Sequence, residues 1–443
     1  MKKKLIHLDL FIGEKRQLKS LKRKKVLSIR EQNRIKEESE VKEKFWQHSK
    51  LISLIANSYK GSTLPHANIL RFKIPKSFSI IDNPETVIAH LGQFAKTYLK
   101  TRPRAAQIDH SSLINYDLAA NGILDLIVVE AKKETKLNKR QLRWSGVFPV
   151  DQDVRRFIRG AGIIKHLNIS NELPKEEESA TLKIFDERNH HYYTYNPTKA
   201  DKKTTVTAKF ADHINSCLNT SGKELTHIAR HKLCEYVGEI LDNVEQHAGM
   251  IDWTIQGYLD NSCEIPLCEI AIFNFGKTIA ENLQNVPRDS YTWKQIGHYI
   301  LLHRAKKLFC PDWSEKDLLT LIALQEKVSS KNLTEEDTRG NGTVDLIEFF
   351  QKISEETGYI GEKRAKMAIL SGNTHITFDG KYKLSAIGNS PRRIAFNIEN
   401  NLLFPPDKDY VKSLKNLNFP GTIISIRFPL SISILAESEE RKL

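Results

Sequence analysis

Residues 236–249, YVGEILDNVEQHAG, constrain this chain most because they combine an apolar stripe with a row of polar groups. On a helix, Glu239, Asn243 and His247 recur every fourth residue and therefore share a face about 80° wide. The Val, Ile and Leu residues of the segment cluster about 110° away, on the side that would pack against a core. We expect the polar row to line a cleft beside that core. A solvated polar face is the alternative that this helix alone leaves open.

The rest of the composition is that of a globular protein. The chain has 443 residues, of which 40% are hydrophobic and 28% charged, enough for two or three domains. No apolar run reaches the ~18 residues of a spanning helix, and charges follow the first short apolar run too closely for a signal peptide. We therefore expect a cytoplasmic protein without membrane contact. The five cysteines form no CxxC pair and are expected to be reduced core residues.

Positive charge is concentrated at the start of the chain. Residues 1–60 hold 17 Lys and Arg against 7 Asp and Glu, which accounts for +10 of the net charge of +14. Residues 1–62 are predicted to form a basic arm, helical or partly disordered. The arm could be simply solvated, could bind nucleic acid through residues 1–45, or could hold an acidic protein partner.

Residues 63–172 are predicted to form a small α/β domain, because short strand and helix patterns alternate there. The expected elements are a strand at 69–75, a helix at 84–100, a strand from 105, a helix at 115–134, and a turn with another helix within 143–169.

One loop of this domain, IDHSSLINYDLAANG, resembles the STAS domain of bacterial anti-sigma-factor antagonists. In that family a strand ends in an Asp-Ser loop that leads into a helix, and Asp109 matches the Asp. His110 stands where the phosphorylatable Ser would follow, and Ser111 and Ser112 are displaced along the loop. The resemblance therefore implies a docking module that has lost its phosphorylation switch.

After a polar connector at 173–204, in which one hairpin is expected, four further features follow in order. A strand at 253–260 precedes an apolar strand that ends in Asn274-Phe275-Gly276. A GKT sequence follows, but Ala271 occupies the position of the first glycine of a P-loop, so a Walker site is not indicated. A glycine-rich helix start at 337–342 could bring backbone NH groups to an anion. The last strands form an antiparallel sheet, and one of them opens with Gly421-Thr422.

This order of segments resembles the GHKL ATPase superfamily, which includes sensor histidine kinases, anti-sigma-factor kinases, gyrase-type ATPases and MutL-like proteins. The resemblance covers residues 205–432 and leaves a tail at 433–443. It implies a two-layer α/β sandwich of the Bergerat type, a mixed sheet with helices on one face. It also implies ATP and Mg²⁺ as ligands, and a lid at about 285–338 whose helical segments would close over the nucleotide.

Carried over to this sequence, Asn243 matches the magnesium-binding Asn of the family, and its amide oxygen is a hard ligand. Glu239 matches the catalytic acidic residue that polarises the attacking water or a partner's hydroxyl. His247 matches a position near the phosphates, although a capping or packing histidine is equally compatible with the sequence.

Asn274 replaces the Asp that accepts a hydrogen bond from the adenine amino group, so that the acceptor remains but its charge is lost. The other nucleotide-binding positions that the resemblance implies are Gly276, Arg339, Gly340, Asn341, Gly342 and Thr422.

The sequence favours a bacterial ATP-binding regulatory switch with slow hydrolysis and nucleotide-controlled binding of a regulatory protein. A homodimer is compatible with this function. Two alternatives stay open: a serine kinase of the anti-sigma type that acts on a separate partner, and a nucleic-acid-binding or protein-binding module that uses the basic arm. A sensor histidine kinase is disfavoured because no dimerising helical hairpin with a phosphoacceptor His is evident before residue 205.

Overall fold

The computed structural model describes residues 51–65, 69–164, 181–189, 202–219, 224–247, 252–262, 266–330, 332, 342–357, 364–386 and 391–430. Within the described residues, no helix is both long enough and apolar enough to cross a membrane.

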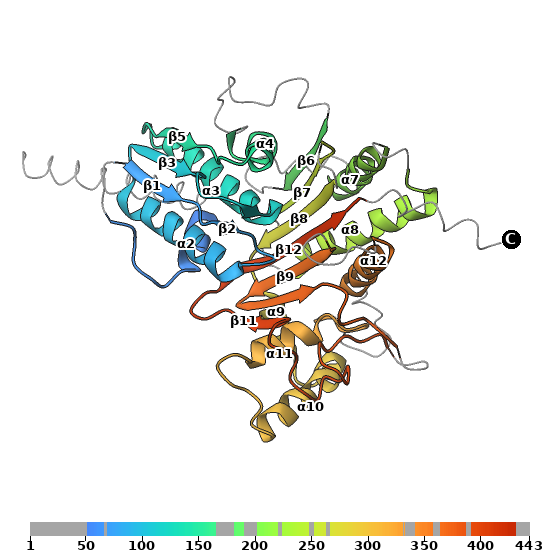
Figure 1. Ribbon diagram of the computed structural model, residues 1–443. Helices are drawn as coiled ribbons and strands as arrows, with labels where there is room; N and C mark the ends of the chain where they lie inside the picture. Colours follow the sequence, from blue (N-terminus) through green and yellow to red (C-terminus); the bar gives the residue numbers. More distant parts are fainter. Residues whose placement is uncertain are drawn as a thin grey trace, which may run out of the picture.

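The amino-terminal part is a small α/β domain, as the alternating sequence pattern predicted, and its strands are parallel (Figure 1). Strands β1, β3 and β5 form one parallel sheet in that order, and β2 pairs with β4. The elements in chain order are β1 (Ile69–Lys73), β2 (Ser77–Phe78), α2 (Pro84–Thr101), β3 (Ala105–Asp109), β4 (Asn115–Tyr116), α3 (Leu118–Leu137), β5 (Arg143–Val147) and α4 (Gln152–Gly160).

Two boundaries of this domain differ from the sequence prediction. Residues 143–147 were expected in a turn and form strand β5, whose polar, largely exposed sequence carries no apolar alternation. Residues 51–57 were assigned to the basic arm, but they are helical. Leu51, Ile52 and Ile55 are buried in the core of the α/β domain, so these residues belong to that domain.

The remaining strands form one seven-stranded sheet in the order β11-β10-β9-β12-β8-β7-β6. Every neighbouring pair in it is antiparallel, so the expectation of a mixed sheet was wrong. Its strands are β6 (Leu182–Asn189), β7 (Trp253–Asp260), β8 (Leu267–Phe275), β9 (Lys366–Gly372), β10 (Thr374–Phe378), β11 (Val411–Ser413) and β12 (Phe419–Pro429). Strand β6 comes from the predicted connector and pairs with β7 at the sheet edge instead of forming a hairpin of its own.

Helices cover both faces of this sheet, which corrects the expectation of helices on one face (Figure 1). One face carries α7 (Lys202–Asn219), α8 (His227–His247) and α12 (Gly342–Thr357), and α3 packs on the opposite face against β7, β8 and β12. Alternate residues of β8 therefore enter different cores. Ile270 and Ile272 pack on the α8 side, whereas Phe273 and Phe275 pack on the α3 side.

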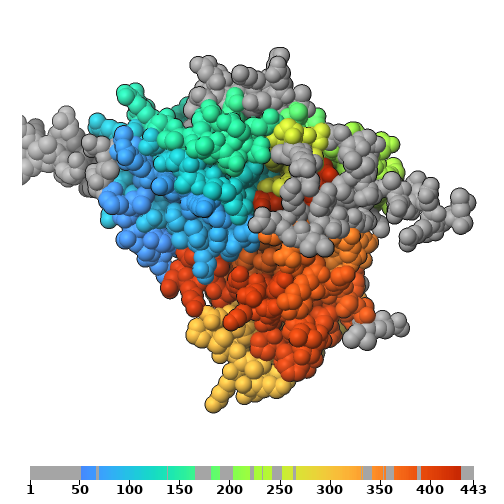
Figure 2. Space-filling model, in the orientation of Figure 1, coloured from blue at the N-terminus to red at the C-terminus, as the bar shows by residue number. Residues whose placement is uncertain are grey.

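The predicted lid segment is helical, as its apolar periodicity indicated. It contains α9 (Ile279–Gln284) at its entry, then α10 (Tyr291–Ala305) and α11 (Glu315–Ile322). A capping box at Ser314 and Asp317 starts α11. Asp317 also accepts a hydrogen bond of 2.6 Å from the Thr374 hydroxyl, which ties α11 to β10. Figure 2 shows the α10–α11 segment as a lobe that projects from the body of the molecule.

Candidate functional site

A cavity of about 140 Å³ lies between the α8 face of the sheet and the α9–α11 segment. Its walls come from four segments that the sequence singled out, with Ile240 on α8, Asn274 on β8, Thr343 on α12 and Thr422 on β12. The lid segment supplies a further wall through residues 323–330. The cavity is thus built where the end of β8 meets the start of α12.

Asn274 and Thr422 form the polar floor of this cavity. They are directly paired across strands β8 and β12, and Asn274 is only 4% exposed. The Thr422 hydroxyl lies 2.9 Å from the hydroxyl of Ser371, which accepts a hydrogen bond of 2.9 Å from the backbone NH of Ile279. This chain of contacts fixes the Thr422 side chain and connects the cavity floor to the first residue of α9.

The turn after Asn274 depends on two glycines. Gly276 has a φ of +126°, and its NH donates to the carbonyl of Pro420 at 3.0 Å. Gly421 has a φ of +149°, and a Cβ there would lie 2.0 Å from the carbonyl oxygen of Asn274. Only glycine permits this approach of β12 to β8. Gly276 therefore lies in the turn at the end of β8, directly before Lys277, which lines the cavity.

Glu239 and Gly342, which are about a hundred residues apart in the sequence, are in contact. A Cβ on Gly342 would lie 2.6 Å from the Cβ of Glu239 and 3.3 Å from its carboxylate oxygen Oε2. The exposed side chain of Glu239 therefore lies against the first residue of α12. Glu239 does not line the cavity itself, whereas the next residues along both helices, Ile240 and Thr343, do.

Several predicted site residues cannot be placed. Asn243 and His247 belong to α8, but their side chains lie outside the described residues. Arg339, Gly340 and Asn341 also lie outside them.

Sequence reasoning missed polar residues that line the same cavity. Lys277 follows Gly276, and its exposed side chain lines the cavity. In the sequence it is the cationic residue nearest to Asn274. Thr343 lies in the first turn of α12, and Asn282 lies on α9. Lys277 belongs to the GKT sequence, which was considered only as a P-loop and was rejected for that reason. The sequence therefore contained a signal for this residue.

No match was found when the chain was compared with protein-family models, curated proteins and solved structures. The resemblances to the GHKL and STAS families therefore remain predictions.

In the part of the chain that the structure describes, no group of three or more His, Cys, Asp or Glu side chains could hold a metal ion. Cys217 and Cys268 are buried, as expected for core residues, but Cys234 is only partly buried and Cys310 is exposed. Cys310 lies in an exposed turn between α10 and α11, whereas the sequence analysis expected it in the core.

The loop that resembles a STAS phosphorylation site has its histidine turned inward. Asp109 ends β3, and its Oδ1 accepts a hydrogen bond of 2.9 Å from the NH of Ser111. His110 is only 4% exposed, and burial lowers its pKa to about 4. Ser111 is exposed, so a hydroxyl, not the imidazole, faces solvent at this loop.

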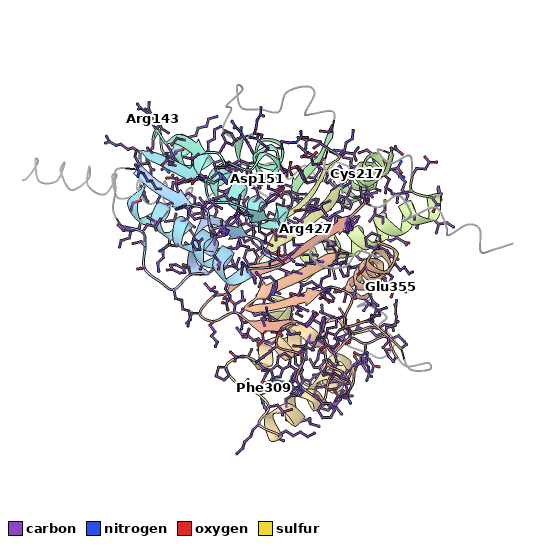
Figure 3. The ribbon with its side chains drawn as sticks, in the orientation of Figure 1. Arg143, Asp151, Cys217, Phe309, Glu355 and Arg427 are labelled. Atoms are coloured by element: carbon purple, nitrogen blue, oxygen red, sulfur yellow. The ribbon has the colours of Figure 1, made fainter. Side chains whose placement is uncertain are left out.

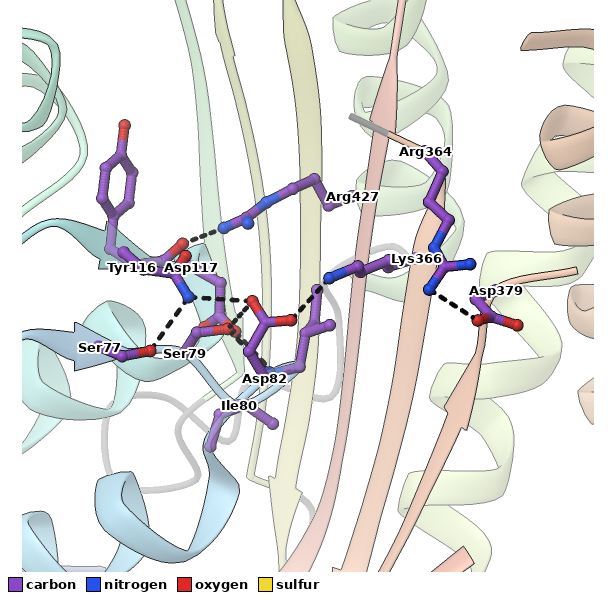
Figure 4. Close-up of polar contacts among 12 residues, drawn as sticks. Ser77, Ser79, Ile80, Asp82, Tyr116, Asp117, Arg364, Lys366, Asp379 and Arg427 are labelled. Atoms are coloured by element: carbon purple, nitrogen blue, oxygen red, sulfur yellow. Dashed lines mark hydrogen bonds and ion pairs between the residues drawn. The ribbon is translucent and has the colours of Figure 1, made fainter. Parts of the chain in front are cut away.

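A buried ionic network joins the α/β domain to the far face of the seven-stranded sheet (Figure 4). Arg427 of β12 donates to Glu269 of β8 at 2.9 Å and also to the carbonyl of Tyr116. The second oxygen of Glu269 accepts from the NH of Leu118 at 2.7 Å, at the start of α3. Burial raises the pKa of Glu269, and the charge of Arg427 opposes this shift.

A second ion pair extends this contact. Lys366 of β9 lies 2.8 Å from Asp82 in the loop before α2. Burial alone would raise the pKa of Asp82, but hydrogen bonds from Lys366 and Asn115 outweigh it and lower the pKa. Strands β8 and β12 therefore contact the cavity on one face and the α/β domain on the other, and β9 adds a contact with the α/β domain through Lys366.

Proposed function

We propose that this chain is an ATP-binding regulatory protein of the GHKL type, in which nucleotide occupancy controls the binding of a protein partner. The observation that carries the proposal is the cavity itself. Its floor and walls come from the four segments on which the family resemblance rests, although these segments are spread over nearly 200 residues of sequence.

The size and polarity of the cavity favour the base as the part of the nucleotide that enters it. About 140 Å³ is well below the ~300 Å³ at which pockets for whole drug-sized ligands begin. Apolar side chains such as Ile240 and Ile424 would cover the faces of the ring. Asn274 and Thr422 would exchange hydrogen bonds with its edge.

The phosphates would then extend toward Lys277 and the first turn of α12. A cation and the NH groups of a helix start both favour an anion. We propose Arg339, Gly340, Asn341 and Gly342 as further phosphate contacts, and His247 as a neighbour of the phosphates.

Mg²⁺ would neutralise the phosphate oxygens when bound, and we propose Asn243 as its protein ligand. Glu239 is a carboxylate beside Gly342 and would orient the attacking water in slow hydrolysis. Residues 323–330, which directly follow α11, contribute to the cavity wall, so an occupied cavity would favour one position of this stretch and of the α10–α11 segment before it. This is the element through which we propose that occupancy reaches a partner.

The proposal is tested by filling the cavity. Ala323 ends α11 and lines the cavity, so Ala323→Phe would occupy the space of the base. Calorimetric titration with Mg-ATP should show binding to the unaltered chain and at least a tenfold loss in Ala323→Phe. Ala305→Phe, at the exposed end of α10, is the matched control and should bind normally. Undetectable binding to the unaltered chain, or equal binding to both variants, would contradict the proposal.

The kinase alternative differs in the fate of the terminal phosphate. A serine kinase would transfer it from ATP to a partner protein, whereas a switch with slow hydrolysis releases it as inorganic phosphate. Labelling with terminally radioactive ATP, in the presence of the products of neighbouring genes, distinguishes the two.

A further inference from the structure

A second hollow, far from the nucleotide cavity, is lined by four arginines. It encloses about 750 Å³ at the amino-terminal edge of the β1-β3-β5 sheet. Arg102 and Arg104 lie in the α2–β3 connection, Arg140 lies in the α3–β5 connection, and Arg143 is the first residue of β5. The NH of Arg143 donates to the carbonyl of Arg104 at 3.0 Å, which holds the two connections side by side.

The helix ends beside the four arginines explain only part of their positions. Arg140 lies 3.5 Å from the buried Glu134. The carboxyl ends of α2 and α3 each contribute about half a negative charge. Together the two helix ends amount to about one negative charge beside four guanidinium groups. Stabilising the two helix ends therefore does not account for the whole cluster.

One donor in the cluster lacks a partner. Nη2 of Arg140 is buried and has no hydrogen-bond partner among the described residues. A buried donor left unpaired costs roughly 1–3 kcal/mol, so such groups usually indicate an absent water or ligand. A phosphate oxygen in the hollow would supply an acceptor for it.

We infer that this hollow binds the phosphate backbone of nucleic acid without regard to sequence. The guanidinium fork matches pairs of phosphate oxygens. Among the described residues, those that line the hollow are Arg, Ala and Gln, with no aromatic ring on which a base could stack. The site therefore suits phosphates and not bases.

The surroundings favour an extended polyanion over a compact phosphorylated molecule. Exposed Lys100, Lys136 and Lys139 continue the positive surface beyond the hollow. Figure 3 shows Arg143 at the outer margin of the molecule, where a long ligand has access. Residues 1–60 add a net charge of +10 to the same chain. This inference does not depend on ATP binding.

The test measures binding of the full-length chain to a labelled duplex DNA of mixed sequence over a series of salt concentrations. The slope of log Kobs against log salt reports the number of phosphates neutralised, at about 0.9 per phosphate. In Arg104→Gln/Arg143→Gln the slope should become shallower by about 2, with at least a tenfold loss of affinity at low salt. The control Lys294→Gln/Lys408→Gln removes the same charge from exposed positions on α10 and before β11 and should keep the slope.

Three outcomes would overturn the inference. An unchanged slope in the arginine variant would mean that the basic arm carries all the binding. Equal losses in the two double variants would mean that only overall charge matters. Binding of inorganic polyphosphate by the unaltered chain, without binding of DNA, would assign the hollow to a compact phosphate ligand.

Discussion

Gly342 lacks room for any side chain, because its backbone lies against Glu239 where α12 meets α8. Gly342→Ala would force the helices apart and should destabilise the fold by about 1–3 kcal/mol, the usual effect of overpacking. Gly238, one residue from Glu239, would place its Cβ 3.9 Å from the nearest atom, which is ordinary contact. Gly238→Ala should therefore stabilise α8 by roughly 0.5–1 kcal/mol. Urea unfolding midpoints measure both, and shifts in the same direction would contradict this account of Gly342.

A second prediction concerns the contribution of the Thr422 hydroxyl to nucleotide binding. Thr422→Val keeps the shape of the side chain but removes the hydroxyl that contacts Ser371 on the cavity floor. One neutral hydrogen bond is worth about 1 kcal/mol, so Mg-ATP should bind about fivefold more weakly. Thr377→Val, half-buried on β10 outside the cavity, is the control. Equal affinities in the two variants would remove Thr422 from the proposed site.

Single residues also mark the limits of sequence reasoning. Asn274 and Thr422 were selected from short patterns, and both line one cavity, because strand ends and glycine turns leave local signals in a sequence. The inward position of His110 had no such signal. Its burial depends on packing between strands that the loop sequence does not specify.

At the scale of elements, strand β10 carries a pH-sensitive contact with the α/β domain. Nε2 of His375 donates to the carbonyl of Ile80 at 2.9 Å. Burial, aided by Lys412, lowers the His375 pKa from 6.5 to about 4. The folded chain therefore binds this proton less readily than the unfolded chain does. The resulting stability is fully present above pH 6.5 and is lost as the pH falls toward 4.

The gap between these two pKa values corresponds to about 3 kcal/mol. In His375→Gln the amide can still donate to Ile80 but does not titrate, so less stability should be lost between pH 7 and pH 4. His110 has a similarly lowered pKa, and its share of the acid sensitivity should remain. Urea midpoints at the two pH values measure the difference. An unaltered acid sensitivity in His375→Gln would show that this contact does not titrate.

Elements were predicted well where their apolar pattern was long and poorly where it was short. The helices at 84–101 and 291–305 and the strands at 253–260 and 419–429 followed their periodicity. Strands β5 and β6 lie at sheet edges and are rich in polar residues, so alternation was weak in both. The arginine hollow also escaped prediction because two loops about 40 residues apart supply its sides.

At the scale of the whole molecule, the buried Arg427–Glu269 ion pair of the sheet contacts the α/β domain, because Arg427 donates to the carbonyl of Tyr116 (Figure 4) and Glu269 accepts from the NH of Leu118. Arg427→Met would leave the carboxylate of Glu269 buried without its charged partner, which typically costs 3–5 kcal/mol. Adding Glu269→Gln should recover much of this loss, because the amide oxygen can still accept from Leu118.

The control for this prediction is Lys383→Met, which breaks an ion pair with Glu355 whose two side chains are each 54% exposed. It should leave the thermal midpoint almost unchanged. If the double variant is no more stable than Arg427→Met alone, charge burial does not explain the loss.

The shared sheet also determines how this chain can be divided. Cutting the chain after residue 164 would remove α3 from Phe273, Phe275 and Ile423 and expose a large apolar surface of the sheet to water. The carboxy-terminal fragment should therefore aggregate on expression, and so should the amino-terminal fragment. A shorter version of this chain should therefore keep α3 and the seven-stranded sheet together.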